Sequence, residues 1–137
     1  MTKIAFSKNG SSPFQQLLGH NDSILKNWTS LEECFYQSHT FTAELKEEVR
    51  RTLAFNNGCQ YCMARGKSSE KIADLKISMA VEIADKISKR QPIDKFDKLK
   101  KEFKEEEIAE LLAFICFTTA SQTFGAILEL QPSCSII

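Results

Sequence analysis

The sequence lacks several features that would place it in a class at once. Its 18 Lys and Arg residues balance its 18 Asp and Glu residues, so no excess of basic charge favours nucleic acid or an anionic membrane. The N-terminus has no apolar stretch of signal-peptide length, and the longest unbroken apolar run, Leu111 to Phe117, is far too short to span a bilayer. We therefore expect a cytoplasmic protein that binds neither nucleic acid nor a membrane.

Strand signals and internal repeats are also absent. No segment alternates apolar and polar residues between turn signals, and no repeat period is visible. With 137 residues, of which 42% are apolar and 26% charged, the sequence matches one soluble domain that is large enough to bury its own core. We expect a single domain over residues 1–137, in which residues 1–11 form a flexible arm of Lys, Ser, Asn and Gly.

Helical spacing and capping signals instead predict an all-α bundle of about six helices. The final helix starts near Glu105 and continues for more than twenty residues that are apolar nearly all round. Other helices or a second copy of the chain must cover such a helix, so we expect a homo-oligomer, with Cys116 buried in the apolar run. The earlier helices are expected over residues 13–18, 23–37, about 43–56, from 59 onward, 69–89 and 94–103.

Five cysteines are an odd number, and two of them, Cys59 and Cys62, form a Cys-x-x-C pair. In a reducing cytoplasm such a pair is more typical of catalysis or metal binding than of a structural disulfide. A zinc site needs four ligands, and the sequence has no second Cys-x-x-C and no clustered His pair, so a redox dithiol is favoured over zinc and over inert thiols. Cys34, Cys116 and Cys134 are interpreted as packing residues or a tail thiol.

The local sequence places the pair at a helix start. Asn56-Asn57-Gly58 tolerates positive φ and commonly ends helices, so Cys59 is expected to open the next helix. The unpaired N–H groups and the dipole of a helix start stabilise a thiolate and lower its pKa. Helix electrostatics therefore favours Cys59, expected to be the more exposed thiol, as the nucleophile.

The stretch Glu47 to Cys62 resembles the carboxymuconolactone decarboxylase and alkylhydroperoxidase D superfamily. Glu47 lies twelve residues before Cys59, and the segment NGCQYC places Tyr61 between the thiols. A late segment, FKEEEIAELLAFICFTTASQTF over residues 103–124, is similar to the final long helix of the family. The resemblance implies an all-α alkylhydroperoxidase D-like fold that oligomerises, and thiol peroxidase chemistry without a cofactor or metal.

The resemblance also implies a role for each residue of the motif. Cys62 would attack a hydroperoxide and become a sulfenic acid, and Cys59 would condense with it to a disulfide. Glu47, expected to be desolvated and to have a raised pKa, would belong to a relay that removes the thiol proton. A dithiol partner of the dihydrolipoamide or thioredoxin type would reduce the disulfide. For attack on peroxide we follow the resemblance and expect Cys62, rather than Cys59, to be the nucleophile.

The sequence departs from the family where a relay histidine is expected, four residues after Cys62, because Gly66 stands there. Three alternatives remain open for activating the thiol: Glu47 acts through water alone, His39 reaches in from another direction, or Arg65 stabilises the thiolate by its charge. Tyr61 is expected to form a wall of the site.

Three functions are compatible with these residues. The favoured one is a thiol-dependent oxidoreductase that reduces hydroperoxides through a Cys59–Cys62 dithiol and disulfide cycle. The alternative is a non-catalytic oligomeric redox-sensing or binding module that keeps the dithiol but lacks the proton relay. Decarboxylation or lactone chemistry ranks last, because the members of the family that perform it do not rely on a Cys-x-x-C pair.

Overall fold

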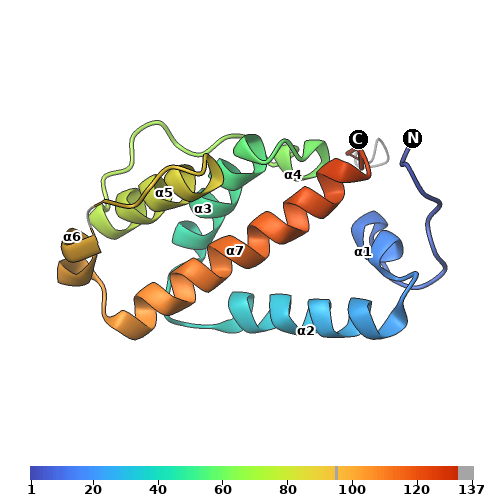
Figure 1. The fold of residues 1–137 in the computed structure, drawn as a ribbon, viewed down its shortest axis with the longest axis horizontal. Helices are drawn as coiled ribbons and strands as arrows, with labels where there is room; N and C mark the ends of the chain where they lie inside the picture. The colour runs from blue at the N-terminus through green and yellow to red at the C-terminus, as the bar shows by residue number, and fades with distance from the viewer. Residues whose placement is uncertain (95, 133–137) are drawn as a thin grey trace.

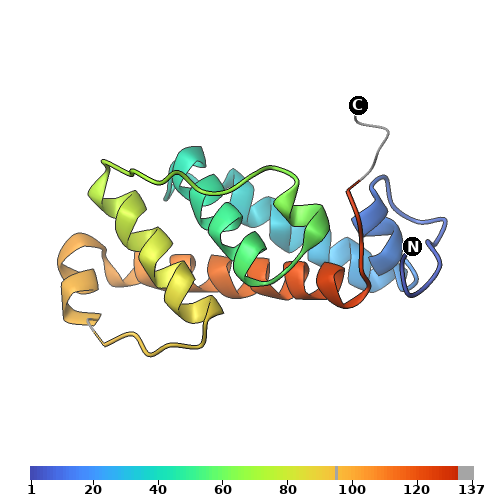
Figure 2. The same ribbon diagram turned by 90° about the horizontal axis from the view of Figure 1, so that it is seen from above.

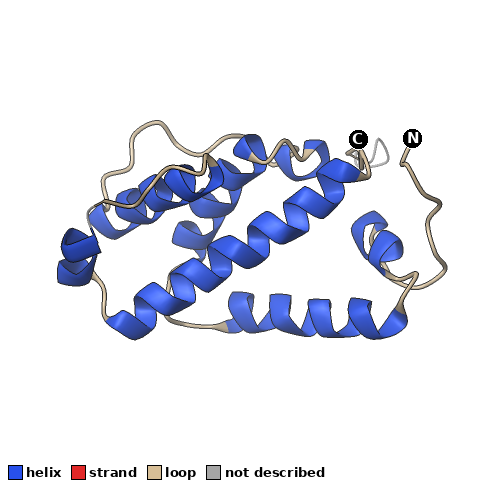
Figure 3. Ribbon diagram, in the orientation of Figure 1, coloured by secondary structure: helices blue, strands red, loops and turns tan. Residues whose placement is uncertain are grey.

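Helices account for most of the chain. The structure is a computed structural model that describes residues 1–94 and 96–132, and over these residues it contains seven helices and no strand (Figure 3). The all-α prediction is confirmed. The helices are α1 Pro13–Leu18, α2 Asp22–Gln37, α3 Ala43–Asn56, α4 Gln60–Met63, α5 Leu75–Ser88, α6 Phe96–Glu102 and α7 Glu105–Ile127.

Short polar side chains cap the first turn of four helices, and so determine where those helices begin. In each case a side-chain oxygen accepts a hydrogen bond from a backbone N–H three residues later, which otherwise has no partner within the helix. The pairs are Ser12 with Gln15 (3.2 Å), Asn21 with Ile24 (3.0 Å), Thr42 with Leu45 (3.1 Å) and Asp74 with Ile77 (3.0 Å). Each cap contributes about 1 kcal/mol to stability.

The longest helix, α7, crosses the whole molecule diagonally (Figure 1). Seen from above, α1 lies at one end of it and α6 at the other (Figure 2). Helices α3 and α5 pack against each other and against α7, and the apolar faces of these three helices supply most of the core. The core residues with 0% exposure are Val49, Leu53, Ala80, Ala84, Leu111 and Ile115.

Helix α2 packs against α7 and the edge of this core through aromatic rings, and its Phe35 contacts the core residue Phe114 with ring centroids 5.7 Å apart. Trp28 and Phe35 both contact Phe117, with ring centroids 5.5 and 5.4 Å apart. The indole N–H of Trp28 also donates to Ser121 Oγ at 3.0 Å. No residue of α2 is fully buried. Aromatic contacts with α7 therefore hold this helix in place.

The predicted helix over residues 69–89 begins six residues late, at Leu75. The backbone N–H and the hydroxyl of Ser69 both donate to the carboxylate of Glu48, at 2.7 and 2.9 Å. These bonds hold Ser69 against α3, and the Asp74 cap then starts α5. A tertiary contact, which sequence periodicity does not encode, overrides the local pattern here.

Residues 1–11 contain no helix, as expected, but they are tied to the rest of the protein. The Lys3 N–H donates to the Leu128 carbonyl at 3.0 Å, and the Ser7 N–H donates to the Gln16 carbonyl at 2.9 Å. Lys3 Nζ also pairs with the Glu129 carboxylate at 2.9 Å. The segment runs beside α1 to the end of α7. The flexible arm that its composition indicates stays a prediction.

One face of α7 is uncovered. The exposed positions recur every three or four residues and form a stripe of small and apolar side chains: Ala109, Ala113, Cys116, Ala120, Thr123 and Ile127. The prediction that Cys116 is buried is wrong, because it lies in the middle of this stripe.

By length and composition α7 could cross a membrane, as could the central helix of many soluble proteins. Of its most apolar window, 39% is buried inside the structure.

Candidate functional site

The backbone hydrogen bonds at the end of α3 fix the position of Cys59. The Gly58 N–H donates to the Phe55 carbonyl and the Cys59 N–H donates to the Ala54 carbonyl, at 3.3 and 3.2 Å. This pair of bonds is the Schellman motif, which needs a residue with positive φ at its turn, and Gly58 has a φ of 69°. The predicted break is confirmed, and Cys59 follows it directly as the N-cap of α4.

Cys59 and Cys62 are joined by a disulfide, with Cα atoms 5.2 Å apart. This pairing is the one that the three-residue spacing predicts, and Cys34 and Cys116 are free. Cys134 lies outside the described residues.

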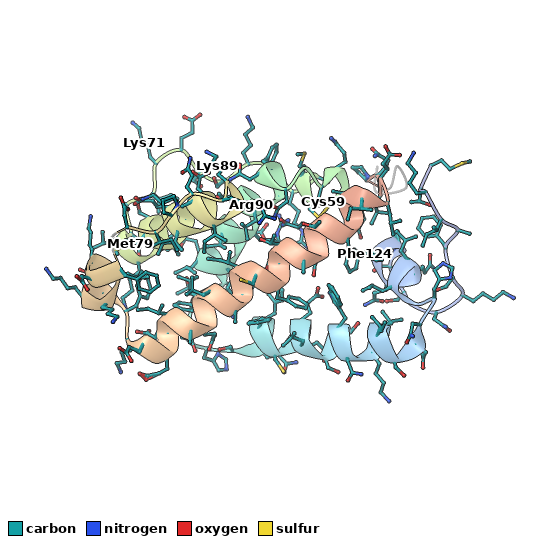
Figure 4. The ribbon with its side chains drawn as sticks, in the orientation of Figure 1. Cys59, Lys71, Met79, Lys89, Arg90 and Phe124 are labelled. Atoms are coloured by element: carbon teal, nitrogen blue, oxygen red, sulfur yellow. A yellow bond between two sulfur atoms is a disulfide. The ribbon has the colours of Figure 1, made fainter. Side chains whose placement is uncertain are left out.

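The two sulfurs have different surroundings. Cys59 has 0% exposure and lies between α4 and the last turns of α7, where a Cβ on Gly125 would be 3.2 Å from its Sγ (Figure 4). The expectation that Cys59 is the more exposed thiol is therefore wrong, because α7 covers it. Helix α4 has only four residues, so its dipole is small, and the electrostatic argument for Cys59 loses its basis.

Cys62 lines a cavity of about 620 Å³, to which α1, α2, α3, α4 and α7 contribute side chains. Aromatic side chains form much of its wall, among them Phe14, Trp28, Tyr36, Tyr61 and Phe117. Tyr61 is thus part of the wall of the cavity that Cys62 lines.

Arg50 connects the Cys-x-x-C segment to α3. Its side chain is 9% exposed, and its Nε and Nη2 donate to both oxygens of Glu47, at 2.7 and 3.0 Å. Its Nη1 donates to the Cys62 carbonyl at 3.0 Å, so this guanidinium holds the backbone of the nucleophile candidate. Sequence analysis missed Arg50. Its position one turn after Glu47 on the same helix was the available signal.

Glu47 does not line the Cys62 cavity, and its carboxylate accepts hydrogen bonds from three arginines. Besides the two bonds from Arg50, it accepts one from Arg51 at 2.9 Å and one from Arg65 at 3.5 Å. Partial burial favours the neutral carboxyl, but hydrogen bonds from Arg50 and Arg51, with the charges of Arg50 and Arg65, outweigh it and lower the pKa to about 2. The expected raised pKa is wrong. A carboxylate with this pKa is a poor proton acceptor at neutral pH.

A pH-dependent contribution to stability follows from the Glu47 pKa. Because the folded pKa lies below the ordinary 4.5, the charged carboxylate stabilises the protein above about pH 4.5, and this term is lost as the pH falls toward 2. We expect Glu47→Gln to lower the free energy of unfolding at pH 7 by about 1–2 kcal/mol, since solvent screens the partly exposed pairs. Urea unfolding of both proteins at a series of pH values measures this loss. Exposed Glu44→Gln is the control, and a Glu47→Gln loss that stays constant from pH 7 to 2 would contradict the assignment.

The other candidate residues lie in two separate cavities. Arg65 lines the cavity with Cys62, whereas His39 lines a separate cavity of about 580 Å³ together with Glu47 and Lys46. His39 and Cys62 are therefore not brought together. Gly66 has a φ of 92°, in the left-handed region that favours glycine, so a histidine at this position would be strained even though nothing lies within 4 Å of its Cβ.

The cavity contains an acidic group that sequence analysis did not single out, Glu32 of α2. Burial raises the pKa of this carboxyl, Arg65 opposes the shift and neighbouring Glu33 adds to it. Nothing in the local sequence distinguishes Glu32 from Glu33, because only the packing of α2 over α7 and α4 decides which of them faces inward.

No metal site accompanies the thiols: within residues 1–94 and 96–132, no group of three or more His, Cys, Asp or Glu side chains is placed to hold an ion. Comparison with known proteins adds no assignment, since no family model matches the chain and no curated protein is significantly similar to it. The site therefore has to be interpreted from its own geometry. It comprises a disulfide between the buried Cys59 and the cavity-lining Cys62, a buried arginine that donates to the Cys62 carbonyl, and the cavity-lining Glu32.

Proposed function

We propose that the protein is a thiol-dependent oxidoreductase that reduces hydroperoxides through a Cys59–Cys62 dithiol and disulfide cycle, in the manner of the alkylhydroperoxidase D-like proteins that its Cys-x-x-C segment resembles. The observation that carries the proposal is the placement of Cys62 in the wall of a cavity, with Cys59 within disulfide-bonding distance beneath it. A peroxide can enter the cavity and meet a sulfur whose oxidised form is resolved at once.

The proposed cycle has three steps. The Cys62 thiolate attacks the terminal oxygen of ROOH, the O–O bond breaks, and sulfenic acid and ROH form. The Cys59 thiol then displaces water from the sulfenic acid and closes the disulfide. A dithiol reductant of the dihydrolipoamide or thioredoxin type finally attacks the accessible Cys62 sulfur, releases Cys59, and leaves as its own disulfide.

A thiol titration tests the proposal. The fully reduced protein is mixed with one equivalent of tert-butyl hydroperoxide, and the remaining thiols and the disulfide peptides are quantified by mass spectrometry. The expected result is the rapid loss of two thiols per chain and a Cys59–Cys62 linkage, with Cys34 and Cys116 still reduced. Recovery of Cys34 or Cys116 as the main site of oxidation would overturn the proposed function.

A second candidate is a redox-sensing or binding module that oxidises once and does not turn over. Two observations favour it: Gly66 stands where the relay histidine is expected, and the Glu47 pKa is about 2, which leaves this carboxylate without a role as base. Turnover separates the candidates. An enzyme consumes many equivalents of peroxide when dihydrolipoamide is supplied, whereas a sensor consumes one and stays oxidised.

We also propose that the chain forms a homo-oligomer through the exposed stripe of α7. Small side chains at positions 113, 116, 120 and 123 allow another helix to approach closely, and burial of the stripe would remove an apolar surface from water. Light scattering at micromolar concentration should give a multiple of 15.5 kDa. Ala120→Glu should shift it toward the monomer, whereas Ala73→Glu, at an exposed alanine before α5, should not. A wild-type monomer would contradict this proposal.

A further inference from the structure

The Cys62 cavity has one carboxyl in its wall among the described residues, that of Glu32. Glu32 comes from α2 and Cys62 from α4, and both line this cavity. Glu47 does not reach this space, and its oxygens are occupied by arginines. Of the two acidic groups near the thiols, only Glu32 shares a cavity with the sulfur that would react.

The surroundings of Glu32 keep its carboxyl available for proton transfer. Within the described part of the chain its oxygens accept no hydrogen bond and make no ion pair within 4.0 Å, unlike those of Glu47. The titratable and charged groups around it are Glu33 and Tyr36 on its own helix, Arg50 from α3, and Tyr61, Cys62 and Arg65 from the α4 region, while α1 and α7 contribute uncharged side chains. Burial raises its pKa, which brings the carboxyl nearer to the pH at which it both accepts and returns a proton.

We propose that Glu32, rather than Glu47, is the general acid and base of the Cys62 reaction. This inference rests on the proposed peroxidase function and deepens it. It provides the proton acceptor that the sequence lacks at Gly66, from a helix outside the Cys-x-x-C motif.

Two proton transfers through Glu32 accompany the first step of the cycle. The Glu32 carboxylate takes the proton of the Cys62 thiol, and the thiolate attacks the terminal peroxide oxygen. Sulfur loses two electrons as the S–O bond forms, and the two peroxide oxygens gain them as the O–O bond breaks. The departing alkoxide then receives the proton from Glu32, so that ROH leaves and the carboxylate is restored.

Neutralising Glu32 tests the assignment against a matched neighbour. Glu32→Gln and Glu33→Gln each remove one negative charge from the same turn of α2, but Glu33 is exposed and does not line the cavity. Reduced proteins are mixed with tert-butyl hydroperoxide and the second-order rate of peroxide consumption is followed from pH 5 to 9. We expect Glu32→Gln to lower the rate at pH 7 about a hundredfold and to remove an acidic limb from the pH profile, and Glu33→Gln to leave both unchanged.

Alkylation of Cys62 by iodoacetamide separates proton transfer from a structural role. Iodide leaves without a proton, so this reaction depends on the thiolate and not on an acid. Loss of the Glu32 charge removes a repulsion that opposes the thiolate, so alkylation of Cys62 in Glu32→Gln, quantified by peptide mass spectrometry, should be as fast as in the wild type or faster.

The outcomes distinguish the two proposals. If the wild-type protein consumes no peroxide, the proposed function is wrong and the role of Glu32 falls with it. If the wild type consumes peroxide and the two variants behave alike, the function stands and the assignment of Glu32 is wrong. A Glu32→Gln protein that loses alkylation and peroxide consumption by the same factor also overturns the assignment, since Glu32 would then only maintain the shape of the site.

Discussion

Cys62→Ser is expected to abolish hydroperoxide consumption, whereas Cys59→Ser should still consume one equivalent and stop. The reason lies in how α7 covers the pair. Cys59 has 0% exposure and its sulfur lies against Gly125, so a peroxide cannot reach it, while Cys62 lines the cavity. Without Cys59 the sulfenic acid formed on Cys62 has no partner thiol and accumulates.

A dimedone-type probe and stopped-flow peroxide consumption measure these results. Cys59→Ser should carry the label on Cys62 after one equivalent of peroxide, and Cys62→Ser should carry none at Cys59. Cys34→Ser, which changes an exposed thiol outside the cavity, is the control and should behave as the wild type. Peroxide consumption at the wild-type rate by Cys62→Ser, with the label on Cys59, would show that the buried sulfur is the nucleophile and would contradict the assignment.

Arg50→Met should cause the second large effect, on stability and on the site together. The guanidinium is nearly buried and makes three hydrogen bonds, two to Glu47 and one to the Cys62 carbonyl. Methionine keeps most of the volume but leaves these acceptors without their donor, so we expect a loss of about 2–4 kcal/mol in the free energy of unfolding. Because the Cys62 backbone loses its anchor, peroxide consumption should also fall, on the order of tenfold to a hundredfold.

Arg51→Met is the matched control, because Arg51 donates to the same carboxylate of Glu47 from a side chain that is 33% exposed. Its loss should cost below about 1 kcal/mol and leave the peroxide rate unchanged. Urea unfolding at pH 7 compares the two variants. Equal destabilisation by both, or an unchanged peroxide rate in Arg50→Met, would mean that the bond to the Cys62 carbonyl does not position the thiol.

Local sequence by itself determined most of the secondary structure and which two cysteines are paired. Ser12 and Thr42 are residue types that favour the N-cap position, and they start α1 and α3. Gly58 marked the end of α3, because its positive φ is the conformation that a Schellman motif requires. The pairing of Cys59 with Cys62 also follows from local geometry, since three residues across a helix start bring two sulfurs together. Each of these features depends on residues within about six positions of one another.

The tertiary structure decided which of these groups are covered, charged or within reach of one another. Cys59 is buried and Cys116 exposed, the reverse of expectation, because burial depends on which face of α7 meets α3 and α4. Glu47 has a low pKa because three arginines converge on it, and Glu32 enters the site because aromatic rings hold α2 over α7. Helical periodicity shows that a face is apolar, but the partner of that face comes from a distant part of the chain. Charge, burial and access at the site follow from those distant contacts.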